Sequence, residues 1–140
     1  MKFELFINFN GNCREAVEFY AQTFNSEVKD LISFGQAPAD PNYPIKDSEK
    51  DLVMYAEVKI GDKNIMFMDM SSDYPLTVGN NISPTINTEQ KDEINRLFDA
   101  LKEGGKVYMA PQKTFFSAWY AMVEDKFGII WQLLIPISRA

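Results

Sequence analysis

Histidine is absent from the 140-residue sequence. It is the commonest general base at neutral pH and the commonest protein ligand of transition metals. Its absence excludes both a histidine-based catalytic centre and a histidine-ligated metal site.

The sequence is also poor in cysteine and in long apolar runs. One cysteine cannot form an intramolecular disulfide. The start of the chain has no basic segment followed by an apolar one, and no apolar run has the length of a membrane span. These features predict a soluble, cytoplasmic, reduced protein that does not associate with membranes.

Positive charge is scarce as well. The 14 Lys and Arg against 20 Asp and Glu give a formal net charge of −6, and the basic residues form no cluster. Nucleic acids and anionic membranes are therefore excluded as partners, because phosphate binding needs clustered Lys and Arg. The 46% hydrophobic residues and the 11 Phe, 6 Tyr and 2 Trp predict a single globular domain over residues 1–140, with an aromatic core or pocket.

Apolar periodicity predicts two helices and eight strands. The first helix follows Asn12, which can cap it together with Glu15, and the second follows a cap at Thr88 and ends at Gly104-Gly105. The predicted strands cover residues 3–9, 28–34, 52–60, 65–70, 81–87 and 106–109 and a closing hairpin over 115–134.

The order strand, helix, strand, strand, strand occurs twice. Ile7 and Ile86, and likewise Phe19 and Phe98, lie 79 positions apart. An internal duplication of a βαβββ module is predicted, with module 1 at about residues 1–70 and module 2 at about residues 80–137. The fold class is α+β, and the sheet face away from each helix must be buried by the second module or by a partner.

Residues 35–51 form a long loop rich in Pro and polar residues. Such loops are uncommon in compact domains. Two interpretations stay open: a lid or partner contact, and a solvated insertion.

Several motifs carry a resemblance to a known family. Residues 11–20, followed by Phe24, contain a Gly, an acidic-Ala pair and a Phe-Tyr pair; residues 60–62 precede a strand that ends in Asp69; and residues 125–131 read Asp-Lys-Phe-Gly-Ile-Ile-Trp. With the duplicated βαβββ order, these motifs resemble the glyoxalase/bleomycin-resistance/dioxygenase group, the vicinal oxygen chelate superfamily, in its PhnB-like (3-demethylubiquinone methyltransferase-like) branch.

The resemblance implies mixed sheets that curl into a trough, and homodimerisation. It also implies metal-ligand positions, which fall near Leu5, Phe67 (with Met66 and Met68), Asn81 and Gln132. PhnB-like members often have His where this chain has Tyr55. Leu, Phe and Met do not bind hard divalent ions, and Asn and Gln are weak neutral ligands. We therefore expect no metal and no cofactor.

The residues expected to bind a ligand are Tyr55, Gln132, Trp119, Trp131 and Met68. Gln132 interrupts an apolar strand, so it needs hydrogen-bond partners if buried, either a ligand or the protein itself. Trp119 and Tyr120 are adjacent and must point to opposite sides of the sheet. The period-2 methionine stripe that contains Met68 is either core or an adaptable apolar surface.

Three residues are candidates for chemistry. Tyr55 and Glu57 share the polar face of a strand, where they are either acid/base groups or surface residues. Cys13 stands just after the expected helix cap, where the helix dipole would lower a thiol pKa.

The sequence predicts a homodimeric binding module for a small, partly apolar molecule. The alternative is an enzyme of the same superfamily, either metal-dependent (lyase, isomerase or dioxygenase-like) or metal-free with Glu57 and Tyr55 as acid and base. A third interpretation is a protein whose dimeric surface serves protein partners.

Overall fold

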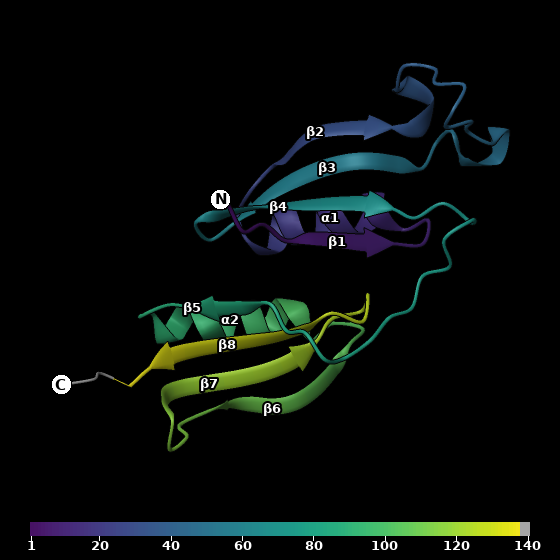
Figure 1. Ribbon diagram of the computed structural model, residues 1–140. Coiled ribbons are helices and arrows are strands. Elements are labelled where there is room, and N and C mark those ends of the chain that lie inside the picture. The colour runs from purple at the N-terminus through teal and green to yellow at the C-terminus, as the bar shows by residue number, and fades with distance from the viewer. Residues whose placement is uncertain (138–140) are drawn as a thin grey trace. The chain divides into compact units, whose positions relative to one another are not determined.

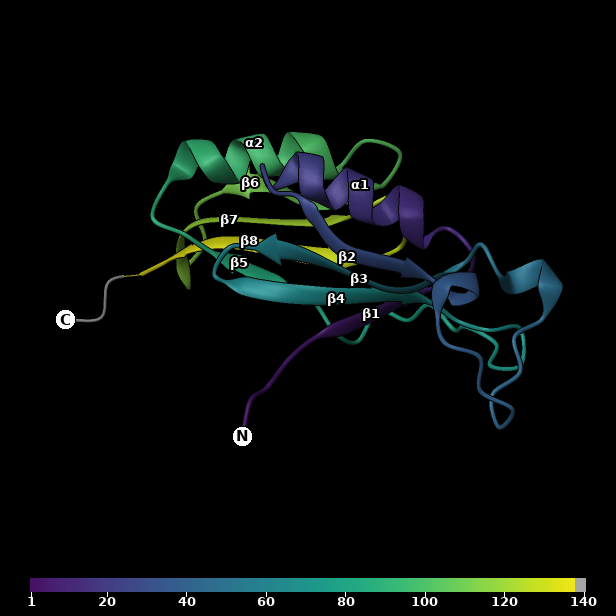
Figure 2. The same ribbon diagram turned by 90° about the horizontal axis from the view of Figure 1, so that it is seen from above.

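The computed structural model describes residues 1–137, and the chain divides into two units with the boundary between Thr77 and Val78. Each unit has two layers, a four-stranded mixed sheet and one helix that covers one of its faces (Figures 1 and 2). The α+β class and the two βαβββ modules predicted from the sequence are confirmed.

The first unit is built in the order strand, helix, strand, strand, strand. Its sheet has the strand order β1-β4-β3-β2, in which β1 is parallel to β4 and the other neighbours are antiparallel. The elements are β1 Phe6–Phe9, α1 Cys13–Thr23, β2 Val28–Ser33, β3 Val53–Ile60 and β4 Lys63–Asp69.

The second unit repeats this topology with the strand order β5-β8-β7-β6. Ile7 pairs with Phe67 in the first sheet and Ile86 pairs with Leu133 in the second, so the two registers correspond. The elements are β5 Thr85–Asn87, α2 Lys91–Leu101, β6 Lys106–Gln112, β7 Ser117–Glu124 and β8 Ile130–Pro136.

The helix of each unit packs its apolar stripe on alternate residues of the central strands. In the first unit Tyr20 of α1 stacks on Phe67 of β4, with ring centroids 5.7 Å apart, and Ala56 on β3 is fully buried opposite Phe67. In the second unit the stripe predicted for α2 is buried, as are Ala121 and Leu133 on its sheet; that stripe consists of Ile94, Leu97, Phe98 and Leu101. Removing these side chains from water is the main stabilising contribution.

Asp69, the last residue of β4, ties three parts of the first unit together. Its side chain is buried, and its Oδ1 accepts hydrogen bonds from the backbone N–H of Gly11 (2.8 Å) and of Cys13 (3.0 Å), while Oδ2 accepts from the N–H of Val53 (2.9 Å). A buried carboxylate is tolerated when charge-assisted bonds of this kind replace its hydration. Asp69 thereby fixes the start of α1 and the start of β3 relative to the end of β4.

Asp125 plays the comparable part in the second unit. Its buried Oδ1 accepts from the N–H of Phe127 (2.8 Å) and of Ile129 (3.1 Å), and its Oδ2 accepts from the indole N–H of Trp131 (2.9 Å). Gly128 completes this turn in the left-handed region, at φ +88°. The carboxylate therefore stabilises the turn of the β7–β8 hairpin.

Long-range contacts and Pro84 overturn several local predictions. The box expected between Asn12 and Glu15 is wrong, because Asn12 makes no side-chain cap bond and Asp69 supplies the acceptor for Cys13. The second helix begins at Lys91 rather than directly after Thr88. The strand expected over 81–87 begins only at Thr85, after Pro84, whose ring removes a ladder donor.

The expected curling is also wrong, because neither sheet curls strongly in Figure 1. We call the side of each sheet away from its helix the open face. No helix within residues 1–137 is long and apolar enough to cross a membrane.

Asp69→Asn is expected to lower the free energy of unfolding by roughly 2–4 kcal/mol, since an amide cannot accept all three bonds and leaves buried donors unpaired. Urea unfolding followed by circular dichroism measures this. Asp62→Asn is the matched control, because Asp62 is exposed in the turn between β3 and β4. Equal stability of the Asp69→Asn protein and the wild type would show that the Asp69 contacts do not hold the unit together.

Candidate functional site

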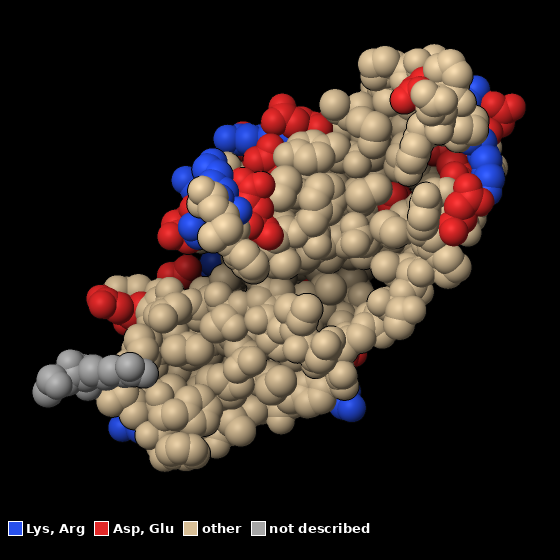
Figure 3. Space-filling model, in the orientation of Figure 1, with Lys and Arg blue, Asp and Glu red and all other residues tan. Residues whose placement is uncertain are grey.

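Few charged side chains lie on the open faces, and Glu57 is one of them. In Figure 3 the sheet surfaces turned to the viewer are mostly tan, and Lys, Arg, Asp and Glu gather toward the margins of each unit. Strand register places Phe6, Asn8, Glu57, Met66 and Met68 on the open face of the first unit, together with Tyr55, and Thr85, Asn87, Tyr120, Met122, Gln132 and Leu134 on that of the second.

On the first open face a tyrosine is bonded to a carboxylate. The Tyr55 hydroxyl donates to Glu57 Oε2 at 3.1 Å, and the Phe6 ring meets Tyr55 edge-on with centroids 6.1 Å apart. Burial, followed by the hydrogen bond to Glu57, raises the pKa of Tyr55. The phenol therefore stays protonated at neutral pH, and the structure brings the two acid/base candidates together.

On the second open face a tyrosine is bonded to an amide. The Tyr120 hydroxyl donates to Gln132 Oε1 at 2.8 Å, from one strand to the next. Burial raises the pKa of Tyr120, so it too stays a hydrogen-bond donor. The ring of Phe116 lies edge-on to Tyr120, with centroids 5.0 Å apart.

These two tyrosines occupy corresponding positions of the duplicated sheet. Tyr55 precedes Ala56, the partner of Phe67, and Tyr120 precedes Ala121, the partner of Leu133. The polar groups that the two tyrosines bond do not lie on corresponding strands. Glu57 pairs with Met66 in the first sheet, whereas Met122 pairs with Gln132 in the second. Each open face thus presents one bonded tyrosine in apolar surroundings, with a carboxylate in one case and a neutral amide in the other.

The two tryptophans predicted to contact a ligand lie on the helix-covered face. The Trp119 indole N–H donates to Asn95 Oδ1 of α2 (3.0 Å), with the Lys91 ammonium 3.8 Å from its ring centroid. Trp131 is 2% exposed and is bonded to Asp125. Because Trp119 and Tyr120 are adjacent in a strand, the sequence predicts only that they point to opposite sides of the sheet. Tyr120, which is not among the residues expected to bind a ligand, is the one on the open face.

The residues at the metal-ligand positions implied by the family resemblance do not fit a metal ion. Phe67 lies under α1, Leu5 and Asn81 lie outside the strands, and Gln132 is bonded to Tyr120. The register positions that correspond across the units are Phe6 with Met66 and Thr85 with Gln132, which include neither a carboxylate nor an imidazole. Within residues 1–137 the structure holds no cluster of three His, Cys, Asp or Glu side chains with metal-site geometry.

Cys13 differs from the sequence prediction in its ionisation. Its side chain is fully buried; burial, with a smaller contribution from the neighbouring Asp69 charge, raises the pKa of the Cys13 thiol to about 12. The helix N-terminus was expected to lower this pKa, but desolvation and a like charge outweigh the dipole. Cys13 is a core residue and not an activated nucleophile.

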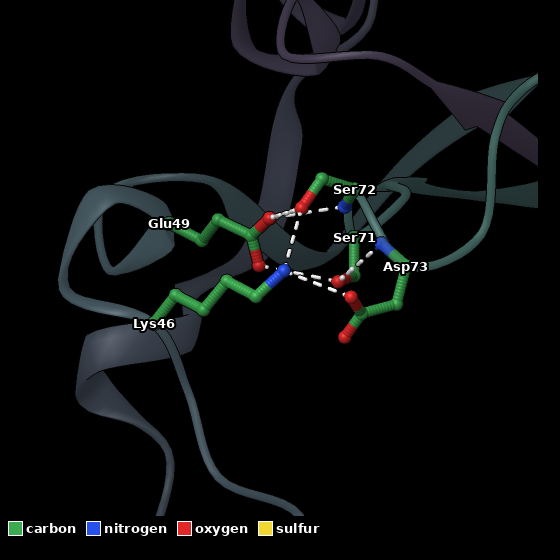
Figure 4. A network of polar contacts seen from close by, with 5 residues as sticks. All are labelled: Lys46, Glu49, Ser71, Ser72 and Asp73. Carbon is green, nitrogen blue, oxygen red and sulfur yellow. Dashed lines mark hydrogen bonds and ion pairs between the residues drawn. The ribbon is translucent and has the colours of Figure 1, made fainter.

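The long loop is fastened to the segment that follows β4 (Figure 4). The Lys46 ammonium pairs with Asp73 Oδ1 (2.8 Å) and donates to Ser72 Oγ (2.9 Å), while Glu49 Oε1 accepts from the Ser72 hydroxyl (2.6 Å) and Glu49 Oε2 accepts from that of Ser71 (3.2 Å). Two short 3-10 turns, Phe34–Gln36 and Asp47–Glu49, shape the loop. We name this set of contacts the loop clasp.

Comparison with known proteins places these features in a family. Residues 1–134 match the sequence model of the 3-demethylubiquinone-9 3-methyltransferase family. The crystal structure of protein PA1353 from Pseudomonas aeruginosa is similar over 97% of this chain and 98% of its own, with 33% identity and a TM-score of 0.86.

Two further structures extend the comparison. A putative 3-demethylubiquinone-9 3-methyltransferase, PhnB protein, from Bacillus cereus is 26% identical, with a TM-score of 0.73 over 96% of this chain and 99% of its own. A glyoxalase/bleomycin resistance protein/dioxygenase family enzyme from Burkholderia phytofirmans covers 94% of this chain and 97% of its own at 16% identity and a TM-score of 0.62, which shows a shared fold.

Cys13 is expected to react slowly with an aromatic disulfide reagent in the native protein at about pH 8, and at the ordinary thiol rate after unfolding in urea. The raised pKa also has a consequence for stability. The unfolded thiol ionises near its ordinary pKa of about 8.5, while the folded thiol stays protonated, so stability falls as pH rises from about 8.5 toward 12.

The contribution of this one group is at most roughly 1.4 kcal/mol per pH unit, and Cys13→Ala should remove it. Alkaline urea titrations of the two proteins measure the difference. Parallel curves, or rapid labelling of the native thiol, would contradict the assignment.

Proposed function

We propose a function from the premise that the chain belongs to the PhnB-like 3-demethylubiquinone-9 3-methyltransferase family, with the glyoxalase/bleomycin-resistance fold. The chain binds a small, partly apolar planar molecule on its open faces without a metal. One observation carries the proposal: Tyr120 and Gln132 form a bonded polar pair on the second open face, beside Met122 and Leu134. Such surfaces with a few oriented polar groups are typical of small-molecule sites.

Gln132 supplies the polar specificity. Its Oε1 is engaged by Tyr120, so its Nε2 hydrogens are the groups that can bond an acceptor atom on a ligand. A neutral amide orients a ligand without the desolvation cost of a charged group. A carbonyl, hydroxyl or acidic oxygen on the ligand is therefore favoured at this position.

The apolar contribution comes from aromatic rings and methionines. Tyr55 and Met68 lie on the first open face, beside Phe6. Planar rings gain apolar contact with aromatic side chains, and thioethers adapt to irregular ligand shapes. Of the residues expected to bind a ligand, Tyr55 and Met68 lie on the first open face and Gln132 lies on the second, whereas contact with Trp119 or Trp131 would need access to the helix-covered face. The family description names a demethylubiquinone, whose ring is planar and bears oxygens, so this class of compound belongs among the ligands to be tried.

Metal independence follows from donor chemistry. The open-face positions that correspond across the two units present Phe, Met, Thr and Gln, and these groups do not assemble three strong ligands around a divalent ion. Elemental analysis showing about one transition-metal ion per chain after dialysis would contradict this part of the proposal.

A metal-free enzyme is the second candidate, because the Tyr55 hydroxyl contacts the Glu57 carboxylate on an open face. The carboxylate can accept a proton from a ligand, and the tyrosine can donate one to a ligand oxygen. Glu57→Gln separates this from binding alone. An enzyme would lose turnover with bound-ligand affinity retained, whereas a binding module would show no turnover in either protein.

Homodimerisation is a further part of the proposal. The open faces expose large apolar side chains such as Phe6, which is 40% exposed, and extended apolar patches are uncommon on monomers. A second copy of the chain would cover part of such a surface by a symmetric contact.

Gln132→Ala is expected to raise the Kd of a planar aromatic ligand about two- to tenfold, the loss of one hydrogen bond, while the fold persists. Thermal shift and tryptophan fluorescence with a panel of quinone-like and drug-like planar compounds identify the ligand. A compound at about 100 times its Kd should stabilise the protein by roughly 2.7 kcal/mol. Gln22→Ala, an exposed change on α1, is the control. The proposal fails if no compound shifts the melting temperature, or if Gln132→Ala unfolds the chain with affinity unchanged.

Sedimentation equilibrium at micromolar concentration is expected to give about twice the 16.1 kDa chain mass. The apolar open faces favour association at this concentration. A single species of monomer mass would remove the dimer from the proposal without affecting the ligand test.

A further inference from the structure

We propose that the turn between β6 and β7, residues 113–116, is part of the ligand site, where Phe115 and Phe116 supply an aromatic wall beside the Gln132 amide. This inference rests on the proposed function and extends it, because the aromatic contact of the second unit then comes from a turn and not from a strand. The ligand class that fits is a planar aromatic molecule carrying a hydrogen-bond acceptor.

The two phenylalanines are exposed to an unusual degree. Phe115 is 94% exposed and Phe116 is 48% exposed, and their rings meet edge-on with centroids 5.2 Å apart. Single exposed apolar residues are ordinary, but a contacting pair of aromatic rings forms a patch that water solvates poorly. A ligand ring placed against this pair would remove apolar surface from water.

The turn that presents the rings is ordered by its own hydrogen bonds. The Thr114 N–H donates to the Ser117 carbonyl oxygen (3.3 Å), the Phe116 N–H donates to Thr114 Oγ1 (3.3 Å), and the Thr114 and Ser117 hydroxyls are bonded to each other. These contacts hold the backbone of the turn in one conformation. The rings are thus presented with little loss of backbone entropy on binding.

A chain of contacts connects the turn to the polar pair of the open face. Phe116 lies edge-on to Tyr120, at 5.0 Å and 77° between ring planes, and Tyr120 in turn donates to Gln132 Oε1. Tyr120 is only 6% exposed. We therefore regard it as a positioning residue, which fixes the Gln132 oxygen so that the amide N–H groups point to the ligand. A ring on the Phe115–Phe116 wall would then lie beside an oriented donor.

The corresponding connection in the first unit is longer and has a different structure. Between β2 and β3 it has residues 34–52, held down by the loop clasp of Lys46 and Glu49. The second unit replaces that polar connection with the short turn of residues 113–116 and its two exposed rings. The aromatic turn is therefore a feature of this unit and not a general requirement of the βαβββ module.

The area of the wall favours a small molecule over a second copy of the chain. Each aromatic side chain buries at most roughly 150–250 Å². Two of them supply at most about 300–500 Å² on their side of a contact, which falls short of the roughly 800 Å² per partner that a specific protein–protein contact buries. That area does match one face of a bicyclic or tricyclic ligand.

The test uses anilinonaphthalene sulfonate, an aromatic probe with a planar naphthalene ring and acceptor oxygens, titrated against the full chain by fluorescence. Phe115→Ala and Phe116→Ala are each expected to raise its Kd roughly three- to tenfold, the value of one aromatic contact. Phe116→Leu, which keeps apolar volume, should give an intermediate value. Phe3→Ala is the matched control, since Phe3 is 91% exposed but lies before β1 in the first unit, and it should leave the Kd unchanged.

Tyr120→Phe tests the positioning role, because it keeps the ring against Phe116 and removes only the hydroxyl. We expect weaker binding of the sulfonate probe but little change for an aromatic hydrocarbon without acceptor atoms. Equal losses for both probes would show that the hydroxyl acts only through the packing of the face.

The inference is overturned, with the proposed function intact, if Gln132→Ala weakens probe binding while both phenylalanine variants bind like the wild type. It is also overturned if these variants lower the oligomer mass with affinity per site unchanged, because a second copy would then occupy the wall. If the wild type binds no planar probe, the proposed function fails and this inference with it.

Discussion

Two buried carboxylates hold the strand ends and turns of this protein, and the geometry of both open faces depends on them. Asp69 gathers three backbone N–H groups from the start of α1 and the start of β3, and Asp125 gathers two backbone N–H groups and the Trp131 indole. Each replaces hydration by three directed bonds, so each tolerates little displacement of the chain around it. In the strands that they adjoin, one side chain lies under the helix and the next lies on the open face.

This alternation places the apolar core residues and the bonded tyrosines on opposite faces of each sheet. Under the helices lie buried apolar residues, including Phe67 and Leu133, and Cys13 of α1 is buried as well, which raises the pKa of its thiol. On the open faces lie tyrosines that stay protonated and bond a carboxylate or an amide. The same fold occurs in both units, but the polar partner of the tyrosine lies on a different strand in each. Tyr55 bonds Glu57 on its own strand, whereas Tyr120 bonds Gln132 on the neighbouring strand. The two faces therefore offer different hydrogen-bonding chemistry on one architecture.

Apolar periodicity and the repeated spacing were enough to predict the two βαβββ modules, because strands and helices bury different sequence periods. Contacts distant in sequence were not predictable. Asp69 lies 56 positions from the Cys13 N–H that it accepts, so it displaced the local cap expected at Asn12. Parity showed that Trp119 and Tyr120 diverge, but only the position of α2 decides which of them faces Asn95. An Asp at the end of an apolar strand was the available signal for the buried carboxylate.

The central claim is that a planar ligand meets the open face of the second sheet, and amide NMR spectra of isotope-labelled protein titrated with anilinonaphthalene sulfonate test it most directly. The account predicts shifts that alternate along β7 and β8, large at Tyr120, Met122, Gln132 and Leu134, and shifts in the turn at Phe115 and Phe116. Alternation is expected because successive residues of a strand face opposite sides of the sheet. Shifts confined to α2, or no saturable shifts at all, would contradict the claim.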